Sequence, residues 1–172
     1  MVYYLGLGSN LGDRRANLDV ALYLLAQRVG SVVAVSSYIE TEPWGFTSPN
    51  TFLNAACAVE TTFSPSQVLH LTQQIERDLG RVHKSVPTLV PTLASEDRDR
   101  ANGQPLSQGC PSPATYADRT IDIDLLLCYD NQGQEVTVHT TELTIPHPLI
   151  DRRDFVRIPM EEVRRLLSLK IC

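Results

Sequence analysis

The stretch Asp118-Arg119-Thr120-Ile121-Asp122-Ile123-Asp124-Leu125-Leu126-Leu127 predicts the central strand of the fold. Successive side chains of a strand point to opposite faces of its sheet. Four aliphatic side chains are therefore expected on one face: Ile121, Ile123, Leu125 and Leu127. Asp122 and Asp124 are expected together on the other face, where two carboxylates repel each other and need a cation, a metal ion or open water beside them. The stretch thus predicts a core strand that also carries a polar site.

The chain has 172 residues and a formal net charge of -5 at pH 7. This length suits a single domain over residues 1–172 that buries a core without disulfide or metal staples. An acidic chain lacks the basic stripe that binds a nucleic-acid backbone, so no nucleic-acid partner is expected. No run approaches the about 18 apolar residues of a membrane span, so no membrane partner is expected either. The cysteines are scattered, and Cys57 and Cys128 in apolar strand patterns predict buried thiols of a reducing compartment, the cytoplasm.

The N-terminal segment predicts a strand over 2–7, a glycine-rich turn and a helix over 14–29 that Asp13 caps. The turn, Gly6-Leu7-Gly8-Ser9-Asn10-Leu11-Gly12, could cradle a phosphate, but it lacks the spacing of a dinucleotide fingerprint or a P-loop, and a structural turn is the alternative. A strand is expected over 31–39. The loop over 40–50 then combines Pro and Gly with Trp44 and Phe46, which suggests a binding surface, a lid, or a plug folded back into the core.

The next elements are a strand over 52–61 and a helix. The strand has small residues on one face and an unexpected polar residue, Asn54. Ser64-Pro65-Ser66-Gln67 is a strong helix start, and Gly80 ends that helix. Three polar side chains lie off its apolar stripe and are expected on a solvated face unless a site recruits them: Gln73, Glu76 and Arg77.

Residues 85–115 show no helical or strand period and are rich in Pro, Ser and Gln, which predicts a long flexible insertion. Beyond the central strand, a further strand is expected over 135–139, and His147 is fixed between two prolines. A charged turn at 151–155 should lead to a short closing helix over 161–169.

The predicted order β-α-β-β-α-β is that of a ferredoxin-like α+β sandwich with a long loop inserted before the fourth core strand. In such a fold two helices would cover one face of the sheet. The opposite face is then expected to be free for ligands.

The carboxylate pair Asp122 and Asp124 could bind Mg²⁺, which prefers oxygen ligands and completes its shell with water and substrate phosphates. Phosphoryl transfer needs such a metal together with positive side chains, because its catalysis is mainly positioning and charge neutralisation. The available cations are Arg81, His83, Lys84, Arg119, His147 and Arg153. The pair alone also fits glycosyltransferases, nucleases and plain exposed strands, so it does not select one function.

An ordered set of motifs selects among these alternatives. It comprises Gly8-Ser9-Asn10-Leu11-Gly12, Thr41-Glu42-Pro43-Trp44-Gly45, Phe52-Leu53-Asn54-Ala55-Ala56, Glu76 with Gly80-Arg81-Val82, Arg119-Thr120-Ile121-Asp122-Ile123-Asp124, and Ile145-Pro146-His147-Pro148 followed by Arg153 and Phe155. Over residues 1–84 and 116–165 the chain resembles 6-hydroxymethyl-7,8-dihydropterin pyrophosphokinase of folate biosynthesis. The resemblance implies an ATP-dependent diphosphotransferase on a ferredoxin-like fold that uses two Mg²⁺ ions. It would convert ATP and hydroxymethyldihydropterin to AMP and the pterin diphosphate, and the next folate-pathway enzyme would be a partner.

The resemblance also implies roles for individual residues. Asp122 and Asp124 would bind both Mg²⁺ ions. The residues that would hold the phosphates and offset charge are Arg81, Arg119 and His147. The residues that would bind the pterin are Thr41, Pro43, Trp44, Phe52, Asn54 and Phe155. The residues that would contact ATP are Gln73, Glu76, Lys84, Tyr116 and Arg153.

The chain departs from the family pattern just before the central strand. Where the family commonly has Arg-Trp-Gly-Pro-Arg-Thr, this chain has Tyr116-Ala117-Asp118-Arg119-Thr120, and His83 stands where a second loop arginine is usual. Asp118 is therefore expected to add negative charge near the metal ions. Two other functions stay open. One is a pterin or nucleotide binder without catalysis, and the other is an RNA-binding module, which net acidity and the lack of an aromatic RNA-binding pattern disfavour.

Overall fold

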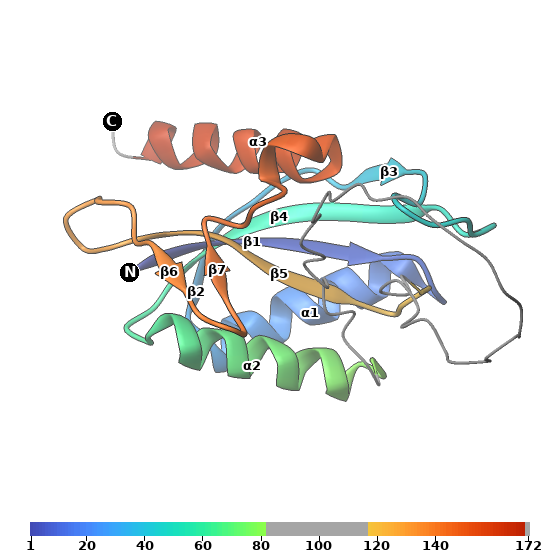
Figure 1. Cartoon of the computed structure of the whole chain (residues 1–172), viewed down its shortest axis with the longest axis horizontal. Helices are drawn as coiled ribbons and strands as arrows, with labels where there is room; N and C mark the ends of the chain where they lie inside the picture. Colours follow the sequence, from blue (N-terminus) through green and yellow to red (C-terminus); the bar gives the residue numbers. More distant parts are fainter. Residues whose placement is uncertain (82–116, 171–172) are drawn as a thin grey trace, which may run out of the picture.

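A computed structural model of the chain describes residues 1–81 and 117–170 (Figure 1). The elements in chain order are β1 (Val2–Ser9), α1 (Arg14–Arg28), β2 (Ser31–Val35), β3 (Ile39–Thr41), β4 (Phe52–Glu60), α2 (Pro65–Asp78), β5 (Asp122–Tyr129), β6 (Val138–His139), β7 (Thr144–Ile145), the 3₁₀ turn η1 (Ile150–Arg152) and α3 (Asp154–Lys170). The predicted insertion over 85–115 lies outside the described residues. So do the candidate ATP contacts Lys84 and Tyr116.

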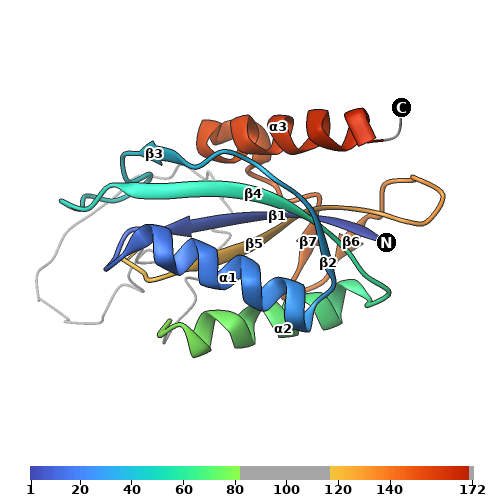
Figure 2. The same ribbon diagram turned by 180° about the vertical axis from the view of Figure 1, so that it is seen from behind.

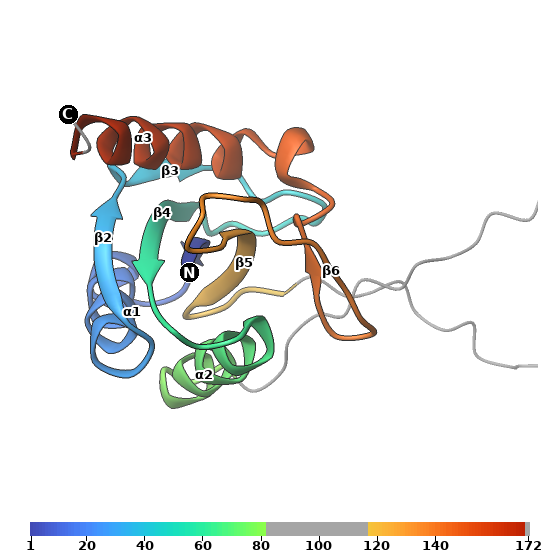
Figure 3. The same ribbon diagram turned by 90° about the vertical axis from the view of Figure 1, so that its left-hand side faces the viewer.

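The main sheet is antiparallel and has the order β2-β4-β1-β5, with β3 added to β4. The prediction of β5 as the central strand was wrong, because β5 lies at the edge of this sheet and pairs in it with β1. Helices α1 and α2 pack against one face of this sheet, and α3 packs against the other (Figure 3). The predicted α+β class is therefore confirmed. Among the described helices, none is both long and apolar enough to cross a bilayer.

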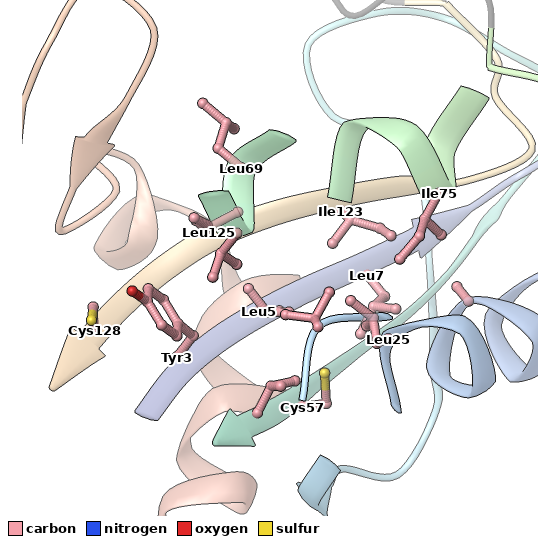
Figure 4. Packing of buried hydrophobic residues seen from close by; sticks show 14 of the residues in the cluster. Tyr3, Leu5, Leu7, Leu25, Cys57, Leu69, Ile75, Ile123, Leu125 and Cys128 are labelled. Atoms are coloured by element: carbon pink, nitrogen blue, oxygen red, sulfur yellow. The ribbon is translucent and has the colours of Figure 1, made fainter. Parts of the chain in front are cut away.

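The main hydrophobic core lies between the sheet and the helices α1 and α2 (Figure 4). Leu25 of α1 and Ile75 of α2 are fully buried there against β1, β4 and β5. Both helices begin as predicted: the Asp13 carboxylate accepts from the Ala16 N–H at 3.0 Å, and the Gln67 side chain accepts from the Ser64 N–H at 2.9 Å. Local capping chemistry thus places these two helices.

The expectation that the second face of the sheet is open was wrong, because α3 covers part of it. A second apolar cluster joins the sheet to Met160 and Val163 of α3. The predicted helix over 161–169 is also wrong in extent, since α3 begins at Asp154 and runs through Pro159. A proline inside a helix gives up a backbone hydrogen bond and usually marks a break. Here the packing of the neighbouring apolar side chains against the sheet offsets that loss.

The face predicted for Leu127 was wrong as well. The register between β1 and β5 pairs Leu5 with Leu125 and Tyr4 with Leu127, which leaves Leu126 as an extra residue in a β-bulge. A bulge interrupts the alternation of side chains. Leu126 and Leu127 consequently both pack in the α3 cluster, whereas the residues before the bulge keep the predicted faces.

Two other predicted strands are shorter than expected (Figure 2). The strand over 31–39 is divided into β2 and β3 at Ser36, whose N–H donates to the Ala56 carbonyl and whose Oγ accepts from the Ala56 N–H, both at 2.9 Å. This hydroxyl takes the place of a ladder carbonyl. The strand over 135–139 is reduced to β6, which forms a separate small hairpin with β7.

Cys57 and Cys128 are fully buried free thiols, as predicted. Burial raises the pKa of the Cys57 thiol to about 12.

Candidate active site

A cavity opens on the α3 face of the sheet, where α3 begins and the sheet is no longer covered. Strands β1, β4 and β5, the segment after β3 and the first residues of α3 line it. The lining residues are Gly6, Leu7, Gly8, Thr41, Glu42, Trp44, Phe52, Asn54, Ala55, Arg119, Asp122, Asp124, Leu126, Arg153, Phe155 and Val156. Nine of the sixteen predicted site residues are in this lining, so the fold brings most of them together.

Glycines on β1 keep the carboxylate pair accessible. Gly8 pairs with Asp122 and Gly6 with Asp124 across the β1–β5 ladder. A Cβ at Gly8 would lie 3.0 Å from Oδ1 of Asn54, which is tighter than an ordinary contact. Side chains on neighbouring strands that face each other normally touch. The glycines therefore leave a hollow beside the acids where a larger residue would fill the space.

Asp122 is part of a mostly buried ion cluster with Arg81 and Glu76. The Arg81 guanidinium donates to Oδ1 of Asp122 and, at 2.7 Å, to Oε1 of Glu76. Burial alone would lower the pKa of Arg81, but the charges of Asp122 and Glu76 outweigh it and raise the pKa. Oε1 of Glu76 also accepts from the backbone N–H of Ile123 at 2.7 Å. The expected solvated position of Glu76 was wrong, because this side chain ties the end of α2 to β5.

Two arginines lie against the aromatic walls of the cavity. The Arg119 guanidinium carbon is 5.2 Å from the ring centroid of Phe52, and its Nε is 3.4 Å from Oδ2 of Asp122. Arg153 is 4.5 Å from the ring centroid of Trp44 and 5.8 Å from that of Phe155. Cations favour the faces of aromatic rings. The cavity therefore presents flat aromatic surfaces and positive charge beside the two carboxylates.

Asn54 supplies a buried amide at the floor of the cavity. Its Nδ2 donates to Oγ1 of Thr41 at 2.8 Å, which fixes the orientation of the amide. Its exposed fraction is only 5%, so a ligand with polar edges is the partner such a group suits. The polar residue that was unexpected in β4 thus faces the cavity.

The other predicted site residues within 1–81 and 117–170 lie outside the lining. Pro43 is next to the lining residues Glu42 and Trp44 in the chain. His147 is held by its backbone N–H, which donates to the Leu126 carbonyl at 2.9 Å. Gln73 is half-buried on α2. Asp118 does not line the cavity either, since its carboxylate accepts from the side chains of Asn10 and Asn50.

Gly6 and Gly8 were predicted in a turn, with a phosphate cradle as the alternative, whereas both lie on β1 and line the cavity. Gly6 and Gly8 are two positions apart on β1, and so they share one face of that strand. Glycine weakens a strand and often marks close approach by a ligand or another backbone. That spacing was the signal that assigns these residues to the site rather than to a turn.

The donor set fits a hard divalent cation such as Mg²⁺. Asp122 and Asp124 offer oxygen ligands on one face, and the glycine hollow leaves room for further oxygen ligands from water or substrate. No cluster of three or more His, Cys, Asp or Glu side chains occurs within residues 1–81 and 117–170. Ligands from a bound phosphate would therefore have to complete the shell.

The chain matches a protein-family model over residues 4–91 and 102–165. That model describes 7,8-dihydro-6-hydroxymethylpterin-pyrophosphokinase (HPPK). The match is interrupted at residues 92–101, within the segment predicted as an insertion.

Curated relatives agree with the family match. The chain is 43% identical over 162 residues to the 2-amino-4-hydroxy-6-hydroxymethyldihydropteridine pyrophosphokinase of Porphyromonas gingivalis, covering 94% of this chain and 90% of that protein. It is 36% identical to the enzyme of the same name from Methylorubrum extorquens, with 93% and 80% covered. It is 32% identical to that from Bacillus subtilis, with 94% and 77% covered.

Proposed function

This chain belongs to the 7,8-dihydro-6-hydroxymethylpterin-pyrophosphokinase family of folate biosynthesis, and on that basis we propose that the cavity on the α3 face is its active site. The enzyme transfers diphosphate from ATP to 6-hydroxymethyl-7,8-dihydropterin and yields AMP. The observation that carries the proposal is the pair Asp122 and Asp124, which lie opposite two glycines and beside an aromatic-lined hollow. The strand order β2-β4-β1-β5 supports the finer assignment of the fold as ferredoxin-like.

The pterin binds, in this proposal, against the aromatic walls. Its ring stacks between Phe52 and Phe155, while the amide of Asn54 reads its polar edge. Backbone groups of Thr41, Pro43 and Trp44 complete the polar contacts. The guanidinium groups of Arg119 and Arg153 lie against these rings, so they would have to shift for the pterin to stack there.

The phosphates of ATP lie over the acid pair. Asp122 and Asp124 would hold two Mg²⁺ ions, which when bound neutralise phosphate charge and orient the reacting groups. Arg81 and Arg119 both contact Asp122. Each guanidinium could therefore release that carboxylate and bind a phosphate oxygen in its place. His147 is proposed as a further phosphate contact.

The remaining ATP contacts are assigned by position. Gln73, Lys84, Tyr116 and Arg153 are proposed to contact the nucleotide. Glu76 acts on it through Arg81, since its carboxylate already binds that guanidinium.

The reaction joins the two halves of the cavity. The pterin hydroxymethyl oxygen forms a bond to the β-phosphorus and gives up its proton to solvent, while the bond from that phosphorus to the α–β bridging oxygen breaks. Negative charge then develops on AMP and is offset by the neighbouring guanidinium groups. The contribution of the protein is therefore to align the two substrates and to compensate charge.

The cellular context is also a proposal. The protein would act in the cytoplasm, which the buried free thiols of Cys57 and Cys128 favour. Its diphosphate product would pass to the next enzyme of the pathway.

The test is AMP release from ATP, Mg²⁺ and hydroxymethyldihydropterin, with pterin binding measured in parallel. We expect AMP to form only when all three are present. We also expect Asn54→Ala to weaken pterin binding, because it removes the buried amide. Tight pterin binding without AMP formation would instead indicate a binder that has lost catalysis.

A further inference from the structure

We propose that Asp118, Asn10 and Asn50 form a positioning clasp that holds both Arg119 and the loop over residues 42–51 in place around the cavity. The proposal rests on the assignment of this cavity to the pterin. None of the three residues touches the cavity, so each would act through its neighbours. The family pattern commonly has other residues at position 118, and the clasp gives this aspartate a role.

The centre of the clasp is the Asp118 carboxylate, which accepts hydrogen bonds from Asn10 and Asn50 on its two oxygens and a further one from the Ser48 side chain. Oδ1 accepts from Nδ2 of Asn10 and Oδ2 accepts from Nδ2 of Asn50, both at 2.7 Å. These residues belong to three segments that are far apart in the chain: the turn after β1, the loop before β4 and the lead into β5. Hydrogen bonds to an ionised acceptor are short and strong. One carboxylate thus joins three segments beside the cavity.

The Asn10 arm fixes the backbone that carries Arg119. Oδ1 of Asn10 accepts from the Arg119 N–H at 2.7 Å, and the Asn10 N–H donates to the Arg119 carbonyl at 3.1 Å. Asn10 is itself buried, with 3% exposed. The Asn10 side chain therefore holds residues 118 and 119, and its Nδ2 also donates to the Asn50 carbonyl at 3.5 Å. The guanidinium of Arg119 can then reach Phe52 and Asp122 from a fixed base.

The Asn50 arm fixes the loop that carries the aromatic wall. This loop bears Trp44, which lines the cavity, and Phe46, whose ring lies 6.2 Å from that of Phe52 in an edge-on contact. Arg14 also holds this end of the loop, because its guanidinium donates to the Thr51 carbonyl at 2.9 Å. The hydrogen bonds from Asn50 and Ser48 to Asp118 tie this end of the loop to the segment of Arg119.

The two arms predict different kinetic effects. Asn50→Ala loosens the aromatic wall and should raise KM for the pterin about tenfold with little change in kcat. Asn10→Ala loosens Arg119, a phosphate residue, and should lower kcat about tenfold. A cluster that served only the stability of the fold would not separate KM from kcat in this way.

An exchange of donor and acceptor tests the clasp directly. Asp118→Asn places an amide N–H₂ against another amide and should raise pterin KM about tenfold. The double variant Asp118→Asn/Asn50→Asp restores a donor facing an acceptor and should return KM to within about twofold of the parent. The matched control is Asp130→Asn, since Asp130 also accepts two hydrogen bonds, from the N–H groups of Gln132 and Gln134, at the opposite end of β5. It should leave pterin KM unchanged.

Two results would overturn the clasp. One is a double variant as impaired as Asp118→Asn, and the other is equal impairment by Asp130→Asn. Asn54→Ala separates failure of the clasp from failure of the cavity assignment. If Asn54→Ala weakens pterin binding and Asp118→Asn does not, only the clasp is wrong. If Asn54→Ala leaves pterin binding intact, the assignment of the cavity is wrong and the clasp fails with it.

Discussion

The two faces of the sheet are built from the same three strands, β1, β4 and β5, but have different roles. On the face toward α1 and α2, apolar side chains fill the whole length of β1, β4 and β5. On the face toward α3, each strand changes character halfway along. There β1 passes from Tyr4 to glycine, β4 from alanine to Asn54, and β5 from leucine to aspartate. One end of this face is core and the other is the cavity.

This difference shows how one strand can support both stability and chemistry. The apolar face anchors β5 at Ile121, Ile123 and Leu125, and thereby holds Asp122 and Asp124 in register on the other face. Alternation separates the two tasks residue by residue. Changes on the two faces should therefore have separable effects.

The largest effect on activity should come from replacing Asp122 or Asp124. If either replacement unfolded the protein, the two faces of the sheet would not have separable roles. Asp122→Ala and Asp124→Ala should each lower kcat/KM by on the order of 10³-fold, because each removes a ligand and a charge from the reacting site. The melting temperature should change little in Asp124→Ala, whereas Asp122→Ala also removes a partner of the buried Arg81 and should lower it. AMP formation and thermal melting measure the two quantities.

The control for the acids is Glu142→Ala, which removes a charge from an exposed position at the β6–β7 hairpin. It should leave both activity and melting temperature unchanged. Near-normal turnover in either aspartate variant would show that the metal assignment is wrong.

The next effect belongs to the apolar face. Leu25→Ala removes a fully buried side chain of α1 and should lower the free energy of unfolding by about 3 kcal/mol. Since Leu25 is on the face away from the cavity, pterin KM should stay constant at temperatures where the variant is folded. Urea denaturation and steady-state kinetics measure these effects. Leu169→Ala, at a position 76% exposed on α3, is the matched control and should change stability by less than about 0.5 kcal/mol.

A smaller effect should appear where the two faces are coupled. Glu76→Gln keeps the size of the side chain but removes the charge that faces Arg81, and should cost about 2 kcal/mol of stability. It should also lower kcat, because Arg81 would then be drawn more strongly to Asp122. Glu60→Gln, at an exposed position of β4, is the control. A loss of stability with unchanged kcat would show that Glu76 contributes to stability and not to catalysis. The roles of the two faces would then be more completely separate.

The parts of the molecule that sequence predicts are those governed by local rules. Alternation gave β4 and most of β5 their correct faces, and side-chain capping gave α1 and α2 their correct starts. The acid pair was found because two aspartates interrupt an otherwise aliphatic strand. In each case the deciding interaction lies within a few residues of the chain.

The parts that sequence does not predict depend on partners far away in the chain. The helix over α3 passes through Pro159 because the sheet supplies packing that a local rule does not see. Leu127 changes face because β1 forces a bulge at Leu126. Glu76 is buried because Arg81 and the backbone of Ile123 meet it there. Patterns within a short stretch of sequence do not predict these long-range contacts.

The last prediction uses the pH dependence of stability to compare the two faces. Burial on the apolar face raises the pKa of Cys57 from near 9 to about 12. Near the cavity, Ser48 and the amides of Asn50 and Asn10 lower the pKa of Asp118. Between about pH 9 and 12 the unfolded chain loses the Cys57 proton while the folded chain keeps it. Folding stability should therefore fall by about 1.4 kcal/mol per pH unit from this thiol alone.

Cys57→Ala should remove that contribution, so stability measured by urea denaturation should fall less steeply with pH in the variant than in the parent. The shift at Asp118 has the opposite sense: its contribution is complete above the ordinary carboxyl pKa and is lost as the pH falls below it, so Asp118→Asn should flatten only the acid side. Because the Cys57 contribution is complete below pH 9, the two proteins should show the same pH dependence from pH 7 to 8, which serves as the control. Equal alkaline slopes would mean that water reaches the Cys57 thiol and that its pKa is not raised. The core between the sheet and the helices α1 and α2 would then be less completely closed than the burial of Cys57 indicates.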